Sequence, residues 1–105
     1  MNTNSSNKSL EVMKKNANKA EKMLKLLANE RRLLILCHLL KKECSVGELV
    51  SHLGLSQSAL SQHLAKMRKE AIVNTKKEGT TIYYRIDRPE VEAILSTLYL
   101  IYCKE

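Results

Sequence analysis

The chain has 105 residues, 44% of them hydrophobic but only 4% aromatic, without Trp or Phe, which predicts one mainly helical domain with an aliphatic core. Eighteen Lys and Arg against eleven Asp and Glu leave a formal charge of +7, which favours a polyanionic partner, either nucleic acid or an anionic membrane surface. No apolar run is long enough for a membrane span, and the first residues lack the apolar segment of a signal peptide, so we expect a cytoplasmic protein with reduced cysteines.

The first third of the chain predicts two helices. Residues 1–8 are polar and predict a disordered tail, and we expect residues 9–105 to form one domain. From Ser9 to Ala28, apolar residues recur every three or four positions among lysines, which indicates a long helix with one apolar stripe. Asn29 is suited to cap a second helix over residues 30–40. That segment has little polar surface, and we expect it to be the buried central helix.

The middle of the chain predicts a helix-turn-helix. Ser45 and Glu48 have the spacing of a capping box, which begins a short helix that ends at Gly54. Ser56 then caps another helix, from Gln57 to about Lys69. Two short helices joined by a three- to four-residue turn with Gly are typical of the helix-turn-helix motif.

The last third predicts a β-hairpin and a final helix. Residues 72–77 and 81–86 are rich in β-branched and aromatic side chains, and the turn at 78–80 separates them. Pro89 lies in the first turn of a helix whose apolar stripe reaches Tyr102. The order of the elements is that of a winged helix-turn-helix with one extra helix on each side. The first and last helices keep apolar stripes that one small domain cannot cover, so we expect them to form a homodimer interface.

The helix that begins at Gln57 has the composition of a DNA-reading helix. Leu60, Leu64 and Met67 form its inward face, and the opposite face carries Ser and Gln near the N-terminus and lysines near the C-terminus. Such side chains suit base edges and phosphates respectively, although an ordinary amphipathic helix has the same pattern. The capping box, the Gly turn and the basic hairpin favour DNA. The residues expected at DNA are Gln57, Ser58, Ser61, Gln62, His63, Lys66, Lys76 and Lys77.

Three of these positions have simpler explanations. Lys76 and Lys77 precede the tip of the hairpin, where they suit the DNA backbone or minor groove. Lysines there also protect an exposed sheet edge from pairing. His63 borders the inward face of its helix, and we favour local packing or a phosphate contact over a metal role.

The segments Asn29–Leu33, Leu36-Cys37, Ser45–Leu49 and Leu55–Leu64 resemble the ArsR/SmtB family of bacterial repressors. The resemblance runs from about residue 20 to the C-terminus. It implies a dimeric winged helix that binds an inverted repeat in double-stranded DNA and is released by an inducer. The chain lacks an acid pair, a nucleophile–base constellation and a phosphate loop, so we do not expect an enzyme.

The metal sites of this family have no match in the chain. The arsenic- and cadmium-type site places cysteines in the first helix of the helix-turn-helix, where residues 48–52 hold none. The zinc-type site needs histidine in the last helix, where residues 89–105 hold none. His38, His52 and His63 are placed on three different helices, so neither a metal nor another cofactor is predicted. A metal-responsive repressor with an unrecognised site is the alternative.

The cysteines indicate a different inducer. Leu36-Cys37 together with Ile101-Tyr102-Cys103 resembles the sulfide- and persulfide-responsive branch of the family. That resemblance implies that Cys37 and Cys103 are a redox pair through which reactive sulfur or oxidation switches DNA binding. Without such a role, Cys37 would be a small buried hydrophobe, and we expect Cys44 to be a spectator thiol in an exposed connection. Outside DNA binding, the competing hypothesis is a basic membrane-surface or scaffolding protein that acts through its first helix.

Overall fold

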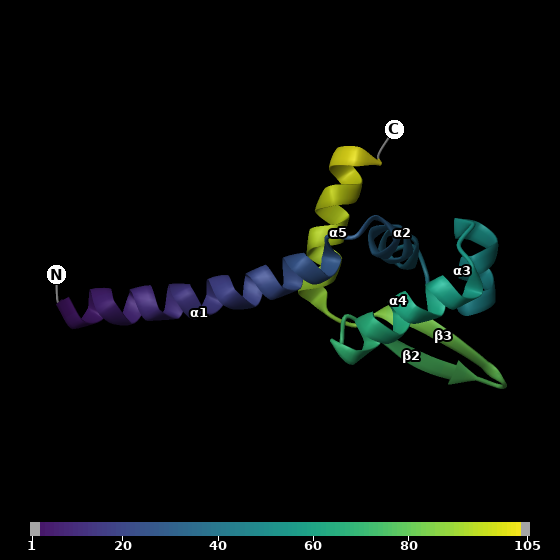
Figure 1. The fold of residues 1–105 in the computed structure, drawn as a ribbon, viewed down its shortest axis with the longest axis horizontal. Coiled ribbons are helices and arrows are strands. Elements are labelled where there is room, and N and C mark those ends of the chain that lie inside the picture. Colours follow the sequence, from purple (N-terminus) through teal and green to yellow (C-terminus); the bar gives the residue numbers. More distant parts are fainter. Residues whose placement is uncertain (1–2, 104–105) are drawn as a thin grey trace.

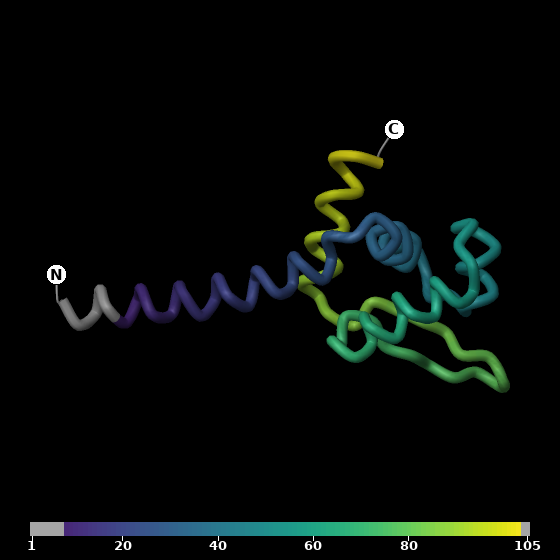
Figure 2. Tube along the Cα trace, viewed as in Figure 1, coloured from purple at the N-terminus to yellow at the C-terminus, as the bar shows by residue number. Residues whose placement is uncertain are grey.

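The fold is a winged helix-turn-helix with a helix on each side of it, as predicted (Figures 1 and 2). A computed structural model describes residues 3–103, with side chains from residue 8 onward. Helices α3 and α4 form the helix-turn-helix, and strands β2 and β3 form the wing. The elements are α1 (Thr3–Leu27), α2 (Glu30–Leu39), β1 (Cys44–Ser45), α3 (Val46–Leu53), α4 (Gln57–Lys69), β2 (Val73–Glu78), β3 (Thr81–Ile86) and α5 (Pro89–Tyr102).

Local signals set most of the helix starts. The Asn29 side chain accepts a hydrogen bond from the backbone N–H of Arg32 and caps α2. Ser45 and Glu48 complete the predicted capping box of α3, and each side chain accepts from the other residue's backbone N–H at 3.1 Å. Gly54 ends α3 with a φ of 67°, a conformation that glycine adopts without a Cβ clash. A side-chain cap at an N-terminus contributes about 1 kcal/mol to helix stability.

The wing belongs to a three-stranded antiparallel sheet in the order β1-β3-β2. The β2–β3 hairpin turns through Gly79, which has a φ of 63°, and Glu78 pairs with Thr81 across that turn. The third strand, β1, was not predicted. It has two residues, Cys44 and Ser45, which pair with Tyr84 and Tyr83. Two residues are too few to show an alternating pattern, so only tertiary pairing reveals this strand.

The N-terminal boundary differs from the expected one. Helix α1 begins at Thr3, so residues 3–8, which we expected in a disordered tail, continue the helix. Once a helix has formed, each further residue adds one hydrogen bond, so a polar segment next to a long helix extends it at little cost. The structure describes neither residues 1–2 nor 104–105. None of the described helices is both long enough and apolar enough to cross a membrane.

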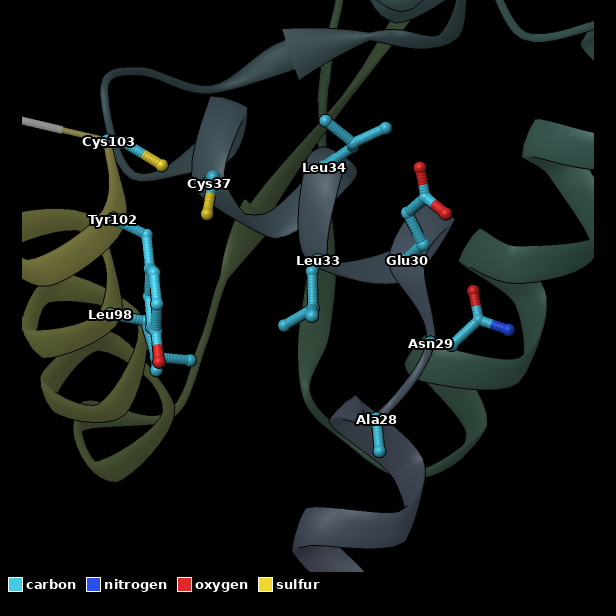
Figure 3. A pocket seen from close by; sticks show the side chains of 9 residues that line it. All are labelled: Ala28, Asn29, Glu30, Leu33, Leu34, Cys37, Leu98, Tyr102 and Cys103. Carbon is cyan, nitrogen blue, oxygen red and sulfur yellow. The ribbon is translucent and has the colours of Figure 1, made fainter.

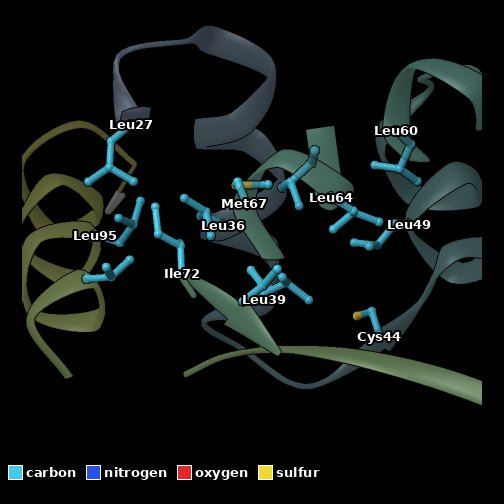
Figure 4. Packing of buried hydrophobic residues seen from close by; sticks show 13 residues of the cluster. Leu27, Leu36, Leu39, Cys44, Leu49, Leu60, Leu64, Met67, Ile72 and Leu95 are labelled. Carbon is cyan, nitrogen blue, oxygen red and sulfur yellow. The ribbon is translucent and has the colours of Figure 1, made fainter. Parts of the chain in front are cut away.

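The core lies between α2, which is the predicted buried central helix, the helix-turn-helix, the wing and the inner face of α5 (Figure 4). Burying one such aliphatic side chain fully contributes about 1.5–3 kcal/mol. Cys44 is a correction to the sequence analysis, because it is fully buried here rather than exposed in a connection, and its thiol donates to the Lys42 carbonyl at 3.5 Å. The buried residues are Leu27, Ile35, Leu36, Leu39, Cys44, Leu49, Leu60, Leu64, Met67, Ile72, Val73, Val91 and Leu95.

Helix α1 extends away from this core (Figure 1). Only its last turns contribute to the core cluster, through the buried Leu27 and the partly buried Met23 and Leu26. Its apolar side chains further out, Leu10, Val12 and Met13, are exposed. The radius of gyration is 17.1 Å, whereas a compact chain of this length has about 13 Å. A large part of α1 therefore packs against nothing within a single copy.

Candidate nucleic-acid interface and cysteine pair

Helix α4 exposes the face that the sequence predicted. Leu60, Leu64 and Met67 are fully buried and hold the helix against the core. The helix begins after Ser56, whose hydroxyl accepts from the backbone N–H of Ala59 at 3.2 Å. Its solvent-facing side therefore offers hydroxyl and amide groups near the N-terminus and an ammonium group further along. The predicted DNA contacts on this side that are exposed are Gln57, Ser58, Ser61, Gln62 and Lys66.

His63 differs from its neighbours because it is partly buried and hydrogen-bonded within the chain. Its Nδ1 accepts from Nε of Arg32 at 3.4 Å. Burial lowers the pKa of His63 below its ordinary value of 6.5, and the cations Arg32, Arg31 and Lys66 lower it further. At neutral pH the imidazole is therefore uncharged, as its role as acceptor requires. The packing role that we considered for His63 agrees with this geometry.

Arg32 is a connecting residue that the sequence analysis did not identify. It lies on α2 and donates from Nη1 to the Leu26 carbonyl at the end of α1, at 2.9 Å. Through Nε it also reaches His63 on α4. One guanidinium thus joins three helices. One of its two partners, His63, is distant in sequence. In the sequence, only the motif Asn29-Glu30-Arg31-Arg32, which carries part of the family resemblance, points to this position.

The wing places its two lysines differently. Lys76 pairs across the hairpin with Tyr83, and Lys77 pairs with Ile82, so the lysines point to opposite faces of the ribbon. Lys76 lies 3.1 Å from Glu78 in an exposed ion pair, and that contact raises the pKa of Lys76. Exposed pairs of this kind contribute little to stability, so a phosphate can replace Glu78 as the partner of Lys76.

Cys37 and Cys103 line the same cavity. The cavity has a volume of about 520 Å³ and lies between α2 and the end of α5 (Figure 3). Burial raises the pKa of the Cys37 thiol above 9.0, and the Cys103 thiol raises it further. Both are free thiols; Cys37 is partly buried and Cys103 is exposed. The other residues that line the cavity are Ala28, Asn29, Glu30, Leu33, Leu34, Leu98 and Tyr102.

The three histidines lie on three different helices, as predicted: His38 on α2, His52 on α3 and His63 on α4. The rings of His38 and His52 nevertheless lie close together, with 4.9 Å between their centroids. Burial lowers the pKa of His38, as do His52, Lys41 and Lys42. The described residues contain no group of three or more His, Cys, Asp or Glu side chains that could hold a metal ion. A structural zinc site has four ligands, so the imidazoles of His38 and His52 are half of such a set.

Comparison with known proteins identifies the family. The sequence profile described as "Bacterial regulatory protein, arsR family" matches residues 29–75. The transcriptional activator HlyU of Vibrio cholerae is 55% identical over 90% of this chain and 88% of its own length. The chain belongs to the arsR family of bacterial regulatory proteins. The expectation of a DNA-binding regulator rather than an enzyme is thereby confirmed.

Members of the arsR family that resemble this chain have opposite regulatory descriptions. The biofilm growth-associated repressor of Xylella fastidiosa is 37% identical over 90% of this chain and 83% of its own length. The structure described as reduced HlyU from Vibrio cholerae has a TM-score of 0.85 and 54% identity, and covers 90% of this chain and 99% of that one. An arsR-family fold of this type thus occurs in an activator and in a repressor.

Proposed function

We propose that this arsR-family regulator is a homodimeric repressor whose operator binding is switched by reactive sulfur or oxidation at Cys37 and Cys103. The observation that carries the proposal is that both cysteines line one cavity between α2 and α5. Helix α2 packs against α3 of the helix-turn-helix as well as against α5. A covalent link across this cavity therefore joins the flanking helix to the support of the DNA-reading unit. The location that we propose for this regulator is the cytoplasm.

The proposed operator is an inverted repeat in double-stranded DNA. In each copy, α4 lies in the major groove, where Ser58, Ser61 and Gln62 read base edges. Lys66, Lys76 and Lys77 meet phosphates. Exposure of these polar side chains on one helix face and on the wing supports this orientation. A two-fold dimer places its two reading helices about 34–36 Å apart along DNA.

The base-reading assignment is testable with two single variants. Gln62→Ala removes an amide that can form two hydrogen bonds to adenine, so we expect a loss of about 1–3 kcal/mol on the preferred sequence and weaker discrimination. Lys77→Ala removes a phosphate contact, so it should weaken all sequences alike and flatten the salt dependence. Fluorescence anisotropy on a duplex selected from a random library, and on unselected duplex, measures both. An unchanged specific-to-nonspecific ratio in Gln62→Ala would contradict the orientation of α4.

The proposed switch begins at the exposed thiol. The Cys103 thiolate attacks the outer sulfur of a persulfide RS–SH, forming Cys103–S–SH and releasing RS⁻. The Cys37 thiolate then attacks the Cys103 sulfur, forming the Cys37–Cys103 disulfide and releasing HS⁻. Only thiolates are nucleophilic, and the raised pKa of Cys37 favours Cys103 as the first site of reaction. A thiol reductant restores the dithiol and takes up the oxidising equivalents.

The proposed consequence of the bridge is a change in the spacing of the two reading helices. In the proposed dimer, α5 belongs to the interface and α2 supports α3. A bridge between α2 and α5 therefore changes the position of each α4 helix relative to the two-fold axis. Displacements of a few ångströms matter, because half-site spacing is set by the DNA helical repeat. HlyU of Vibrio cholerae, to which this chain is 54% identical, has a structure described as reduced, and this supports a role for the oxidation state of the cysteines.

Mass spectrometry paired with DNA affinity tests the switch. Glutathione persulfide treatment of the full chain should remove two hydrogens per copy, or insert additional sulfur between the same two cysteines, and release DNA. Cys37→Ser and Cys103→Ser should stay on DNA under the same treatment. Cys44→Ala is the matched control, chosen over serine because Cys44 is fully buried and a hydroxyl there would lack a strong partner. Release of DNA by Cys103→Ser at the wild-type persulfide concentration would refute the pair.

One observation favours a second candidate, a metal-responsive regulator. The neighbouring rings of His38 and His52 could hold a transition metal with further ligands from a second copy. Titration of Zn²⁺ into the protein–DNA complex, with His52→Gln and EDTA as controls, separates this from the sulfur switch. Release of DNA by Zn²⁺ in the wild type, but not in His52→Gln, would establish the metal-responsive function instead.

A further inference from the structure

A second hollow, the basic hollow, lies where α1, α2 and α4 meet. Its volume is about 300 Å³, and cations from all three helices line it. We propose that the basic hollow is the seat of one phosphate of the DNA backbone, so that α1 and α2 belong to the DNA-binding surface. This inference rests on the proposed function, because it takes α4 as the DNA-reading helix. The lining residues are Lys22, Lys25, Leu26, Arg32, Lys66 and Glu70.

Arg32 gives the hollow a rigid wall. Its Nη1 donates to the Leu26 carbonyl at 2.9 Å and its Nε donates to Nδ1 of His63 at 3.4 Å. A guanidinium carries five N–H donors in a planar fork that matches phosphate oxygens. Two donors fix its orientation, and three are left for a ligand. The side chain is therefore oriented before any phosphate arrives, which lowers the entropy lost on binding.

Two lysines of α1 add positive charge beside the Arg32 guanidinium. Lys22 and Lys25 are three residues apart, so they lie on the same side of the helix. Lys25 approaches Glu21 at 3.9 Å, but both side chains are mostly exposed, and such a pair contributes little. Glu70 is the one acid that lines the hollow, against four cations. The hollow thus has an excess of positive charge, and a bound anion reduces the repulsion between these cations.

Lys66 connects the basic hollow to the reading face of α4. It follows Gln62 by four residues, which places it one turn along the helix and about 40° around it. The basic hollow therefore borders the reading face on its α1 side. A helix in the major groove, which is about 12 Å wide, has a phosphate backbone along each edge. Cations beside that helix are in reach of one of these backbones, and this continuity favours DNA over a free phosphate compound.

A charge-removal pair tests the seat on the full chain. In Lys22→Gln/Lys25→Gln, glutamine keeps helix propensity and removes both α1 cations. The control, Lys14→Gln/Lys15→Gln, removes the same charge from the same helix at exposed residues that do not line the basic hollow. On a 30-base-pair random-sequence duplex, the slope of log affinity against log salt should fall by about 2 in the test pair, about 1 for the phosphate contact that each of the two copies loses. It should stay unchanged in the control.

Methylphosphonate scanning then locates the phosphate. Single neutral linkages are placed along the duplex that the protein selects from a random library. One linkage per half-site should weaken the wild type several-fold and Lys22→Gln/Lys25→Gln clearly less, because only Arg32 and Lys66 remain at the seat. Equal salt slopes for the two pairs, or no such linkage, would overturn the inference. Inorganic phosphate that raises the Tm of the wild type but not of the test pair, without a responsive linkage, would assign the hollow to a free anion and overturn it too.

The same duplexes separate this inference from the proposed function. If Gln62→Ala relaxes sequence preference while Lys22→Gln/Lys25→Gln behaves like its control, α4 reads DNA and only the phosphate seat is wrong. If Gln62→Ala leaves sequence preference unchanged, the orientation of α4 itself fails, and the seat beside it loses its basis.

Discussion

Ala71 has a backbone conformation that side-chain-bearing residues seldom adopt. Its φ is 59°, and it follows the last turn of α4. Its N–H donates to the Arg68 carbonyl at 3.0 Å, and the Ile72 N–H donates to the Met67 carbonyl at 2.9 Å. These two bonds are those of a Schellman motif, in which glycine is the usual residue at the left-handed position. The buried Ile72 supplies the apolar contact of the motif, so packing holds Ala71 in this conformation.

Replacing Ala71 with glycine should stabilise the fold. The left-handed conformation costs a residue with a Cβ roughly 1–2 kcal/mol, while glycine loses up to about 1 kcal/mol more chain entropy on folding. We expect Ala71→Gly to raise the free energy of unfolding by about 0.5–1 kcal/mol, measured by urea denaturation. Ala65→Gly, at an exposed position inside α4, is the control and should lower it by a similar amount. A loss of stability in Ala71→Gly would show that the motif carries no strain.

At the scale of elements, His63 makes the contact between α2 and α4 depend on pH. Burial and the cations Arg32, Arg31 and Lys66 lower the pKa of His63 below 6.5. In the pH range between the folded-state pKa and 6.5, the unfolded chain binds a proton that the folded chain does not. The stability associated with neutral His63 is therefore full above pH 6.5 and is lost as the pH falls through the folded-state pKa. His38 has a pKa shifted in the same direction and adds to the effect.

His63→Asn should remove the share of this pH dependence that belongs to His63. The Asn Oδ1 lies close to the position of Nδ1, so it can keep the acceptor for Arg32 without titrating. Urea denaturation at pH 7.5, 6.5 and 5.5 should show a smaller loss of unfolding free energy in His63→Asn than in the wild type, by at most one proton's worth of slope. His38 retains its own part in both proteins. Parallel loss in the two proteins would mean that His63 titrates normally.

The helices were predictable because their signals are local. Capping residues such as Ser45, Glu48 and Asn29 lie within one turn of the groups that they satisfy, and apolar spacing identifies the inward faces. Strand β1 is different, since Cys44 and Ser45 gain their strand character only from pairing with Tyr84 and Tyr83. The burial of Cys44 follows from that pairing, which explains why a connection rich in lysines gave the wrong expectation.

At the candidate site, the sequence predicted which face of α4 is exposed, but it did not predict the side-chain contacts between helices. The exposed face of α4 follows from the position of its buried leucines, because a helix fixes opposite faces. The Arg32–His63 contact and the His38–His52 pair join residues from different helices. Such contacts depend on how the helices cross, which periodicity does not specify. Their chemistry therefore became visible only in three dimensions.

At the scale of the whole molecule, most of the large apolar side chains that are exposed lie on the two flanking helices. The extended part of α1 exposes Leu10, Val12 and Met13, and Leu24 is 56% exposed nearer the core. The end of α5 exposes Leu100 and Ile101. Exposed apolar side chains gathered on the flanking helices indicate an interaction surface. A two-fold partner buries the same surface on both copies, which is why we expect a dimer to be the DNA-binding form.

A charge at Leu24 should separate the copies without unfolding either. Leu24 is half-exposed in one copy, so Leu24→Glu leaves the core intact, yet in the proposed dimer it places two unpaired carboxylates at the interface. A buried charge that is left without a partner costs about 3–5 kcal/mol. This cost raises the dissociation constant of the dimer at least 100-fold. Light scattering at micromolar protein should then give the mass of one copy, 12.0 kDa, with an unchanged helical circular dichroism signal.

Asn18→Glu is the matched control, because Asn18 lies on the lysine-bearing side of α1, where a new carboxylate stays in solvent. It should keep the dimer. DNA affinity supplies the decisive comparison. Two linked readers bind an inverted repeat far more tightly than one, since the second binding event is intramolecular. Leu24→Glu should therefore lose its preference for two half-sites over one, while Asn18→Glu keeps it. A monomeric Leu24→Glu with undiminished affinity for the full inverted repeat would show that each copy reads DNA alone, and that the apolar stripes of α1 and α5 have another purpose.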